Sequence, residues 1–280
     1  MARSSGRGTG TEVARMPNLI PIVASMMRAR LRRRPRPRGS GTVDHAALGR
    51  VLQTLASGGI GALPVEEIAG YVGALSGIDP DTLGRDDALA YWINLYNAGA
   101  LAAAGRTWGE GRFSIMTLPG AFTTPFVTVA GEPLSLDDVE HGKVRRFGDP
   151  RIHAALVCGS VSCPTFRHEP FVGVRLDVQL EDQMRLFLSS GGAVPDRTGG
   201  VVSLSRIFRW YGTDFVRPNR MPTVVPVRPR RVLHAITRWL DAGDAAWVRT
   251  ERPVVAFQPY DWALGCVVGP PAAGSAGALS

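Results

Sequence analysis

The segment from His153 to Cys163 holds the residue types that nucleophilic catalysis needs, an imidazole and two thiols. A cysteine attacks a substrate only as its thiolate, and a neighbouring histidine is a common means of lowering the thiol pKa. Cys163 lies beyond a Gly-Ser turn and is free to fold back toward the preceding residues. We therefore expect Cys163 to be the nucleophile, with His153 or His141 as the base.

The spacing of the nearer pair makes Cys158 the second choice as nucleophile. If residues 152–158 form one strand, His153 and Cys158 are an odd number of positions apart and face opposite sides. We place Cys158 among the residues that line a substrate site. The alternative is a small core hydrophobe, because free cysteine is among the most buried residue types.

Two asparagines on one expected helix are candidates for stabilising charge. Asn94 and Asn97 are three positions apart, so their amides share a helix face and can point into one pocket as oxyanion donors. Amides in a buried helix also fasten neighbouring loops, which is the structural alternative.

Arg151 and Glu140 are candidate substrate-binding residues. Arg151 follows a proline and can hold a carboxylate through two hydrogen bonds, or pair internally with Glu140 or Asp149. Glu140 precedes His141 at the end of an expected helix turn. His141 can act there as a base or sense pH, and the alternative for Glu140 and His141 is a solvated pair.

The same cysteines admit a metal or a disulfide interpretation. His153, Cys158, Cys163 and His168 recur at intervals of five and supply two imidazoles and two thiolates, which is a tetrahedral zinc set. The spacing differs from that of known short zinc frameworks, and a Cys158–Cys163 disulfide is a further option. We expect no metal and no other cofactor.

Hydrophobic periodicity predicts helices first and strands scattered behind them. Helices are expected over residues 43–55, 65–75, 86–105, 176–188, 206–215 and 232–240, and a capped one begins after Ser135. Strands are expected over residues 125–129, 151–157, 201–204 and 254–257. The helix over residues 86–105 is apolar on most faces and should be buried at the centre. This order predicts an α+β fold in which that helix packs against a small mixed or antiparallel sheet.

Several motifs together carry a family resemblance: YWINLYNA at residues 91–98, LSLDDVEHGKVR at 134–145, DPRIHAALVCGSVSCP at 149–164 and YDW at 260–262. They resemble the domain-of-unknown-function family 547 over about residues 85–265. The resemblance implies site candidates at Asn94, Asn97, Glu140, His141, Arg151, His153, Cys158 and Cys163 but no reaction. A looser similarity is to cysteine-peptidase-like and transglutaminase-like folds, although the central helix carries asparagines where those folds carry the thiol.

The positive charge is concentrated at the start of the chain. The chain carries a formal net charge of +8, and residues 1–40 hold ten arginines and one glutamate, or +9, which leaves −1 for the other 240 residues. We therefore expect residues 1–42 to be a disordered basic tail and any contact with nucleic acid or an anionic membrane to be made there. Residues 43–268 should form one domain, followed by a flexible tail over residues 269–280.

The remaining expectations concern compartment and function. No apolar run is long enough for a transmembrane segment, and three cysteines fit a reducing compartment, so we expect a cytoplasmic protein. Two functions stay open, and the sequence does not decide whether the protein is an enzyme. One is a cysteine-dependent hydrolase or acyl-transferase. The other is a non-catalytic module for a peptide or small ligand, with structural cysteines or a zinc-stabilised core.

Overall fold

The computed structural model describes residues 27, 29, 31–223 and 225–270. The fold is α+β, with 54% helix and only small sheets, as the sequence predicts. The described helices are α2 (Ala46–Gly58), α3 (Val65–Ser76), α4 (Arg85–Gly109), α5 (Leu136–Gly142), α6 (Ile152–Ala155), α7 (Leu176–Phe187), α8 (Arg206–Trp210), α9 (Gly212–Val216), α10 (Pro229–Ile236) and α11 (Ala242–Glu251). The described strands are β1 (Val127–Val129), β2 (Glu132–Leu134), β3 (Ala193–Asp196), β4 (Val201–Leu204) and β5 (Val254–Phe257).

Short 3-10 turns connect many of these elements. They lie at Ile60–Ala62, Pro80–Thr82, Ile115–Thr117, Val144–Phe147, Gly173–Arg175, Pro218–Arg220 and Thr237–Trp239. A π-type turn, Leu188–Gly192, follows α7.

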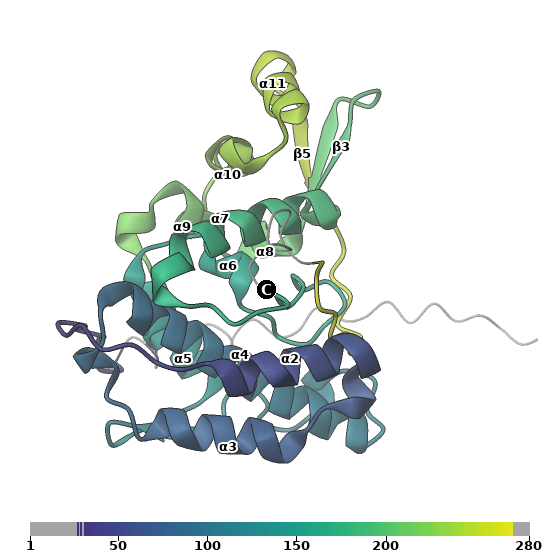
Figure 1. Ribbon diagram of the computed structural model, residues 1–280. Helices are drawn as coiled ribbons and strands as arrows, with labels where there is room; N and C mark the ends of the chain where they lie inside the picture. The colour runs from purple at the N-terminus through teal and green to yellow at the C-terminus, as the bar shows by residue number, and fades with distance from the viewer. Residues whose placement is uncertain (1–26, 28, 30, 224, 271–280) are drawn as a thin grey trace, which may run out of the picture.

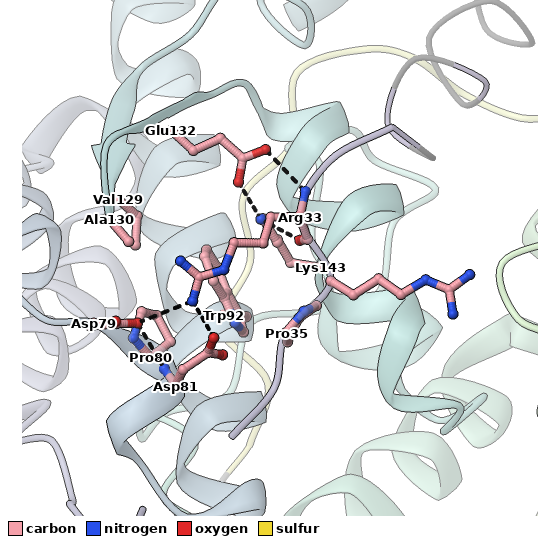
Figure 2. Close-up of a pocket in the computed structure, with 11 residues that line it drawn as sticks. Arg33, Pro35, Asp79, Pro80, Asp81, Trp92, Val129, Ala130, Glu132 and Lys143 are labelled. Carbon is pink, nitrogen blue, oxygen red and sulfur yellow. Dashed lines mark hydrogen bonds and ion pairs between the residues drawn. The ribbon is translucent and has the colours of Figure 1, made fainter. Parts of the chain in front are cut away.

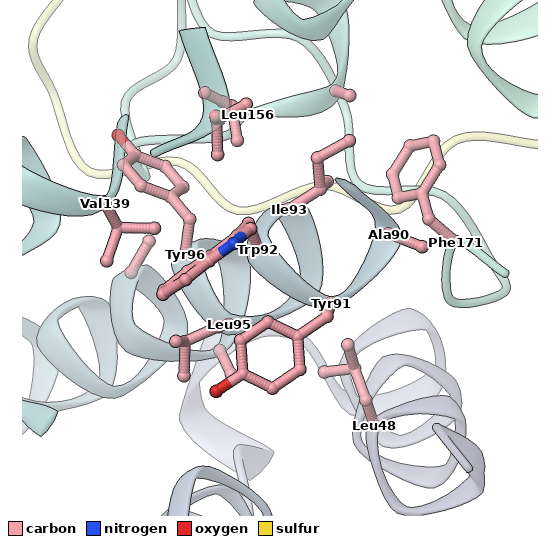
Figure 3. Close-up of a cluster of buried hydrophobic side chains, with 14 of the residues drawn as sticks. Leu48, Ala90, Tyr91, Trp92, Ile93, Leu95, Tyr96, Val139, Leu156 and Phe171 are labelled. Carbon is pink, nitrogen blue, oxygen red and sulfur yellow. The ribbon is translucent and has the colours of Figure 1, made fainter. Parts of the chain in front are cut away.

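Helix α4 is the centre of the larger hydrophobic core. Every residue from Ala88 to Leu101 is buried, so the helix must be covered on all sides. Helices α3 and α5 pack directly against it, and α2 packs on α3 (Figure 1). Aromatic side chains of α4, including Tyr91, Trp92 and Tyr96, fill the space between these helices (Figure 3). The predicted central helix is confirmed.

The small mixed sheet belongs to a second cluster of buried residues. Strands β3 and β4 pair antiparallel, and β5 joins β4 in parallel, in the order β3-β4-β5. This sheet and helices α7 to α11 enclose the second core, to which Phe208, Phe215 and Trp239 contribute. Mainly helices and 3-10 turns cover α4, and Val127, Val129 and Leu134 of the antiparallel pair β1–β2 lie in the same core, so the three-stranded sheet is not the one beside the central helix.

A two-stranded hairpin leads into helix α5. Strands β1 and β2 pair antiparallel, and the residues between them, Ala130 and Gly131, both have positive φ, as such tight turns require. Ser135 then accepts a hydrogen bond from the backbone N–H of Asp138, whose carboxylate accepts one from the backbone of Ser135. This capping box is the one expected from the sequence, and it fixes the start of the helix that carries Glu140.

The expected buried strand over residues 151–157 is wrong, because the first part of this segment is helix α6. The Asp149 carboxylate accepts a hydrogen bond from the backbone N–H of Arg151 at 2.9 Å, and the Pro150 carbonyl accepts one from His153 at 3.3 Å. These contacts turn the chain into a helix, and it becomes extended only at Leu156. The strand-parity argument about His153 therefore no longer applies.

Other differences lie in the second half of the chain. The predicted helix over residues 206–215 is divided at Tyr211 into α8 and α9, and β3 and α11 were not predicted. The predictions over residues 65–75, 176–188, 201–204 and 254–257 are confirmed.

Residues 31–41, here called the arm, lie against the body of the protein. Arg32 pairs with Asp138, and Gly41 forms a parallel bridge with Leu83. These residues belong to the segment expected from the sequence to be a disordered tail, whereas here they have specific partners, because carboxylates of the body face the arginines of the arm. The part of the predicted tail at residues 1–26 lies outside the described residues.

The segment after β5 returns to residues 156–163, which carry Cys158 and Cys163 and are here called the cysteine loop. Leu264 and Val268 form isolated bridges with Ser160 and Phe166. This crossing brings Tyr260 to the cysteine loop. The predicted C-terminal tail from residue 271 onward lies outside the described residues.

Within the residues that the structure describes, none of the helices has the length and apolar character that crossing a membrane requires.

Candidate functional site

The cysteine loop follows α6 and is fastened to the central helix by one side chain. The amide of Asn97 donates to the carbonyl of Ala155 at 2.9 Å and accepts from the N–H of Val157 at 3.1 Å. Gly159 then turns the loop with a φ of 87°, a conformation that favours glycine. From the other side, Ala263 accepts a hydrogen bond from the N–H of Val161 at 2.9 Å. The cysteine loop is thus held at both faces.

Cys163 lies at the centre of a group of hydrogen-bonding partners. Its sulfur accepts from the backbone N–H of Cys158 at 3.2 Å. The hydroxyl oxygens of Ser160 and Tyr260 lie 3.3 and 3.2 Å from the same sulfur. Ser160 also donates to the hydroxyl of Tyr260 at 3.0 Å, which leaves the Tyr260 proton directed at the sulfur. The backbone N–H of Cys158 and the hydroxyl of Tyr260 are thus placed to donate to a thiolate at Cys163.

The two neighbouring thiols have opposite pKa shifts. Burial by itself raises the pKa of Cys163, but hydrogen bonds from Cys158, Ser160 and Tyr260 outweigh it and lower the pKa to about 6. The hydrogen bond to Cys163 and burial raise the pKa of Cys158 well above its usual value. At neutral pH the geometry therefore favours a thiolate at Cys163 and a thiol at Cys158.

A third cysteine lies close to this pair. Cys266 is half-buried, and burial and the charge of Cys163 raise its pKa to about 12. It provides an unactivated thiol in the same chain.

The histidines belong to a separate buried network of charged side chains. The Nε2 atom of His153 lies 2.9 Å from the Asp214 carboxylate, and its ring stacks on Tyr211 with the ring centroids 4.1 Å apart. Arg145 donates two hydrogen bonds to Asp214, at 2.8 and 3.0 Å, and both of these side chains are fully buried. Nδ1 of His141 lies 3.3 Å from the Arg145 guanidinium.

Glu140 completes this network from helix α5. Its carboxylate lies 3.5 Å from Nδ1 of His141 and is hydrogen-bonded by the hydroxyl of Tyr211. Burial lowers the pKa of His141 to about 4, so its imidazole is neutral at pH 7. Burial raises the pKa of Asp214, but His153 and Arg145 outweigh that effect and keep the pKa below its usual value. Glu140 and His141 are thus buried residues and not a solvated pair.

The thiol group and the histidine network are neighbours without a direct hydrogen bond. In the described part of the chain, no imidazole is among the hydrogen-bond partners of Cys163. Tyr96 is close to both groups: burial raises its pKa, and so do the charges of Glu140, Cys158, Tyr211 and Cys163. The expected Cys163–His153 pair is therefore brought to one region but not into contact.

The two asparagines of α4 serve to hold loops. Asn94 donates to the carbonyl of Phe171 at 2.7 Å and accepts from its N–H at 3.1 Å, as Asn97 does for the cysteine loop. Both amide groups are thus bound to buried backbone, as in the structural alternative.

Arg151 pairs with carboxylates of the protein itself. It contacts Asp149 at 2.7 Å, Asp177 at 2.8 Å and Glu181 at 3.5 Å. Internal ion pairing, which the sequence left open, is thus what the structure shows for this side chain.

The zinc interpretation finds no support in the geometry. Nε2 of His153 is hydrogen-bonded to Asp214, and the described residues contain no group of three or more histidine, cysteine or acidic side chains arranged to hold a metal ion.

Sequence reasoning missed several residues of the site. Ser160 and Tyr260 lie in two of the motifs that carry the family resemblance, and their presence in these motifs is the sequence feature that could have identified them as site residues. Arg145 closes the second motif, whereas Tyr211 and Asp214 lie in a segment with no distinguishing pattern. Their contacts join residues more than sixty positions apart, so only the fold reveals them.

Comparison with known families gives one result. Residues 80–188 match the family described as a protein of unknown function, DUF547. This confirms the resemblance inferred from the motifs, most of which lie within the matched range. The comparisons with curated proteins and with solved structures found no match.

Proposed function

We propose that the DUF547 domain of this chain is a cysteine-dependent hydrolase or acyl-transferase with Cys163 as its nucleophile. The observation that carries the proposal is the environment of the Cys163 sulfur, which accepts from the backbone N–H of Cys158, faces the hydroxyl of Tyr260 and has its pKa lowered to about 6. A thiol with this pKa is mostly thiolate at pH 7 and needs no base for activation.

The reaction begins at the thiolate. The sulfur attacks the carbonyl carbon of an ester, thioester or amide, the bond to the leaving group breaks, and a thioester to Cys163 forms. Tyr260, whose pKa is raised by burial and by the charges of the two thiols, stays protonated. Its hydroxyl lies 3.2 Å from the sulfur and can give its proton to the leaving group as the thiolate charge is consumed, and Tyr260 is reprotonated by the proton that the entering water or amine releases in the second half of the reaction.

His153 is the better of the two imidazoles for the second half of the reaction. Asp214 holds its Nε2 atom, which fixes the ring and leaves Nδ1 to accept a proton from the water or amine that attacks the thioester. His141, with a pKa of about 4, is too weak a base at neutral pH. We also propose that the domain is related to cysteine-peptidase-like folds. The support for this is that α4 is a buried central helix close to the thiol.

An activated ester tests the proposal. Incubation of the full chain with p-nitrophenyl acetate should release one p-nitrophenolate per chain in a rapid phase and acetylate Cys163, as located by mass spectrometry. Cys163→Ala should abolish the rapid phase, whereas Cys266→Ala should retain it. Acetylation of another residue, or release at the same rate in Cys163→Ala, would contradict the proposal.

A further inference from the structure

The pocket where the arm meets the body is lined by Arg33, Arg34 and Pro35 of the arm and by acidic side chains of the body. Asp79 and Asp81 come from the turn before α4, Glu132 from β2 and Asp138 from α5. Figure 2 shows three of these carboxylates around the arm, with Lys143 between them. We call this set the acidic groove.

Two arginine side chains of the arm are recognised directly. Arg32 donates two hydrogen bonds to Asp138, at 2.7 and 2.8 Å, in the bidentate geometry that suits a guanidinium. Arg33 pairs with Asp81 and extends toward Asp79 (Figure 2).

The backbone of the arm is recognised as well. Lys143, whose side chain is 5% exposed, donates from Nζ to the carbonyl of Arg33 at 2.7 Å, and Glu132 accepts from the N–H of Arg33 at 3.3 Å. Asp81 accepts from the N–H of Arg36 at 2.6 Å through its carboxylate and from the N–H of Arg38 at 3.0 Å through its carbonyl. These bonds require an extended segment and fix its register.

At Gly39 the backbone of the arm comes very close to the backbone of the body. A Cβ atom at this position would overlap the carbonyl oxygen of Thr82, so only glycine allows the arm to leave the groove along this path.

The arm buries little apolar surface. Arg33, Arg34, Arg36 and Arg38 are exposed, and Leu31 is 88% exposed. The guanidinium groups of Arg34, Arg36 and Arg38 have no partner among the described residues. Charge and backbone hydrogen bonds therefore hold the arm, and such contacts exchange more readily than an apolar core.

We propose that the acidic groove is a recognition site for arginine-rich, extended segments of a partner protein, and that the arm is a tethered ligand of the same site. The preferred pattern has two adjacent arginines at the positions of Arg32 and Arg33. A proline follows where Pro35 lines the groove beside Trp92 (Figure 2). The positions of Arg34 and Arg36 accept other side chains.

Peptide binding to the full chain tests this specificity. The test protein is the full chain with the substitutions Arg32→Gln and Arg33→Gln, which weaken binding of its own arm to the acidic groove. The probe is a fluorescent peptide with the natural sequence of residues 31–38, LRRRPRPR. Anisotropy should show binding that weakens with salt. A peptide with glutamine at positions 32 and 33 should bind at least about tenfold more weakly. The matched control peptide has glutamine at positions 34 and 36 instead, so its charge equals that of the first variant peptide. It should bind like the native peptide.

A groove variant completes the test. Asp81→Asn, whose side chain contacts the arm, should weaken the native peptide at least about tenfold while the far-ultraviolet circular dichroism stays unchanged. Equal binding of the two glutamine peptides would show attraction by charge alone and overturn the proposal.

Absence of binding is also decisive. Trypsin cleavage after Arg38 reports whether the arm of the double variant has left the groove. Faster cleavage than in the unmodified chain, without peptide binding, overturns the proposal because the groove is then open. Cleavage that is no faster overturns it too, because Arg32 and Arg33 are then not what holds the arm.

Discussion

Asn94 and Asn97 lie three residues apart on α4, yet each fastens a different segment to it. Both use the amide nitrogen and the amide oxygen on backbone groups, Asn94 at Phe171 and Asn97 on either side of Leu156. Because buried backbone groups that lose a partner are costly, each asparagine stabilises the fold. Asn97 alone also sets the path of the chain into Cys158.

This pair gives a prediction with its own control. Asn97→Ala leaves two buried backbone groups without partners and should lower the free energy of unfolding by roughly 2–5 kcal/mol, as measured by urea denaturation. Asn94→Ala should cost a similar amount. Only Asn97→Ala should change the alkylation rate of Cys163 in the folded protein. A changed rate in both variants, or in neither, would show that Asn97 has no special link to the cysteine loop.

At the level of single residues, type and spacing point to the two thiols but do not reveal the hydrogen-bond partners that lower the pKa of Cys163. Cys163 was singled out because thiols beside an imidazole are reactive, whereas its actual partners are hydroxyls and a backbone N–H. Tyr260 lies about a hundred positions away, and no local pattern places it there. His153 is expected from the sequence to be a base for the thiol, whereas its hydrogen-bond partner in the structure is Asp214, from a helix whose sequence gave no signal.

The Arg145–Asp214 pair joins elements that are distant in sequence. Arg145 lies in the 3-10 turn after α5, Asp214 in α9 and His153 in α6. The carboxylate of Asp214 therefore holds three elements of the site together. Removing one partner of a fully buried pair leaves the other charge uncompensated, which costs far more than the loss of an exposed pair.

This contrast predicts two different stabilities. Asp214→Asn should lower the free energy of unfolding by about 3–5 kcal/mol, because Arg145 stays buried without its counter-charge. Asp177→Asn removes an ion pair of Arg151 whose carboxylate side chain is 85% exposed, and should cost less than about 1 kcal/mol. Both are measured by urea denaturation. Equal costs would mean that the buried pair does not connect these elements.

Among the secondary-structure elements, those with a long or capped sequence pattern could be predicted, and the short helix α6 could not. Helix α4 has an apolar run that only a buried helix explains, and the Ser135 capping box marks the start of α5. The run before Cys158 is equally apolar, but Asp149 and Pro150 bend its beginning into α6 through backbone contacts. Apolar composition shows that such a segment is buried without showing whether it is helix or strand.

Across the whole molecule, the charges are distributed less evenly than their sum suggests. The body has a net charge near zero by sequence, yet four of its carboxylates lie together in the acidic groove beside the arm. The arginine-rich start of the chain was identified from composition. Its docking onto the body was not, because Asp81, Glu132 and Asp138 come together only in the fold.

Two buried histidines predict how stability depends on pH. Burial lowers the pKa of both His45 and His141 to about 4, below the unfolded value of 6.5. Between these values the unfolded chain binds protons that the folded protein does not. Stability is therefore retained above pH 6.5 and is lost as the pH falls toward 4, by up to about 3 kcal/mol for each histidine.

Urea denaturation at several pH values between 7 and 4 measures this loss. His45→Gln should make the loss shallower, because the 2.6 Å contact with Tyr71 no longer involves a group that must stay neutral. His234→Gln replaces an exposed histidine and should leave the profile unchanged. Profiles of the same slope in His45→Gln and the unmodified chain would show that burial of His45 does not govern acid stability.

The central claim is that Cys163 is a thiolate at neutral pH, and alkylation by iodoacetamide from pH 5 to 9 tests it most directly. With labelled cysteines located by mass spectrometry, the rate at Cys163 should rise with a midpoint of about 6, whereas Cys266, with a pKa of about 12, should react slowly throughout. Tyr260→Phe should move the Cys163 midpoint upward. Labelling of Cys163 only above about pH 8, only after denaturation, or no faster than Cys266 would contradict the account.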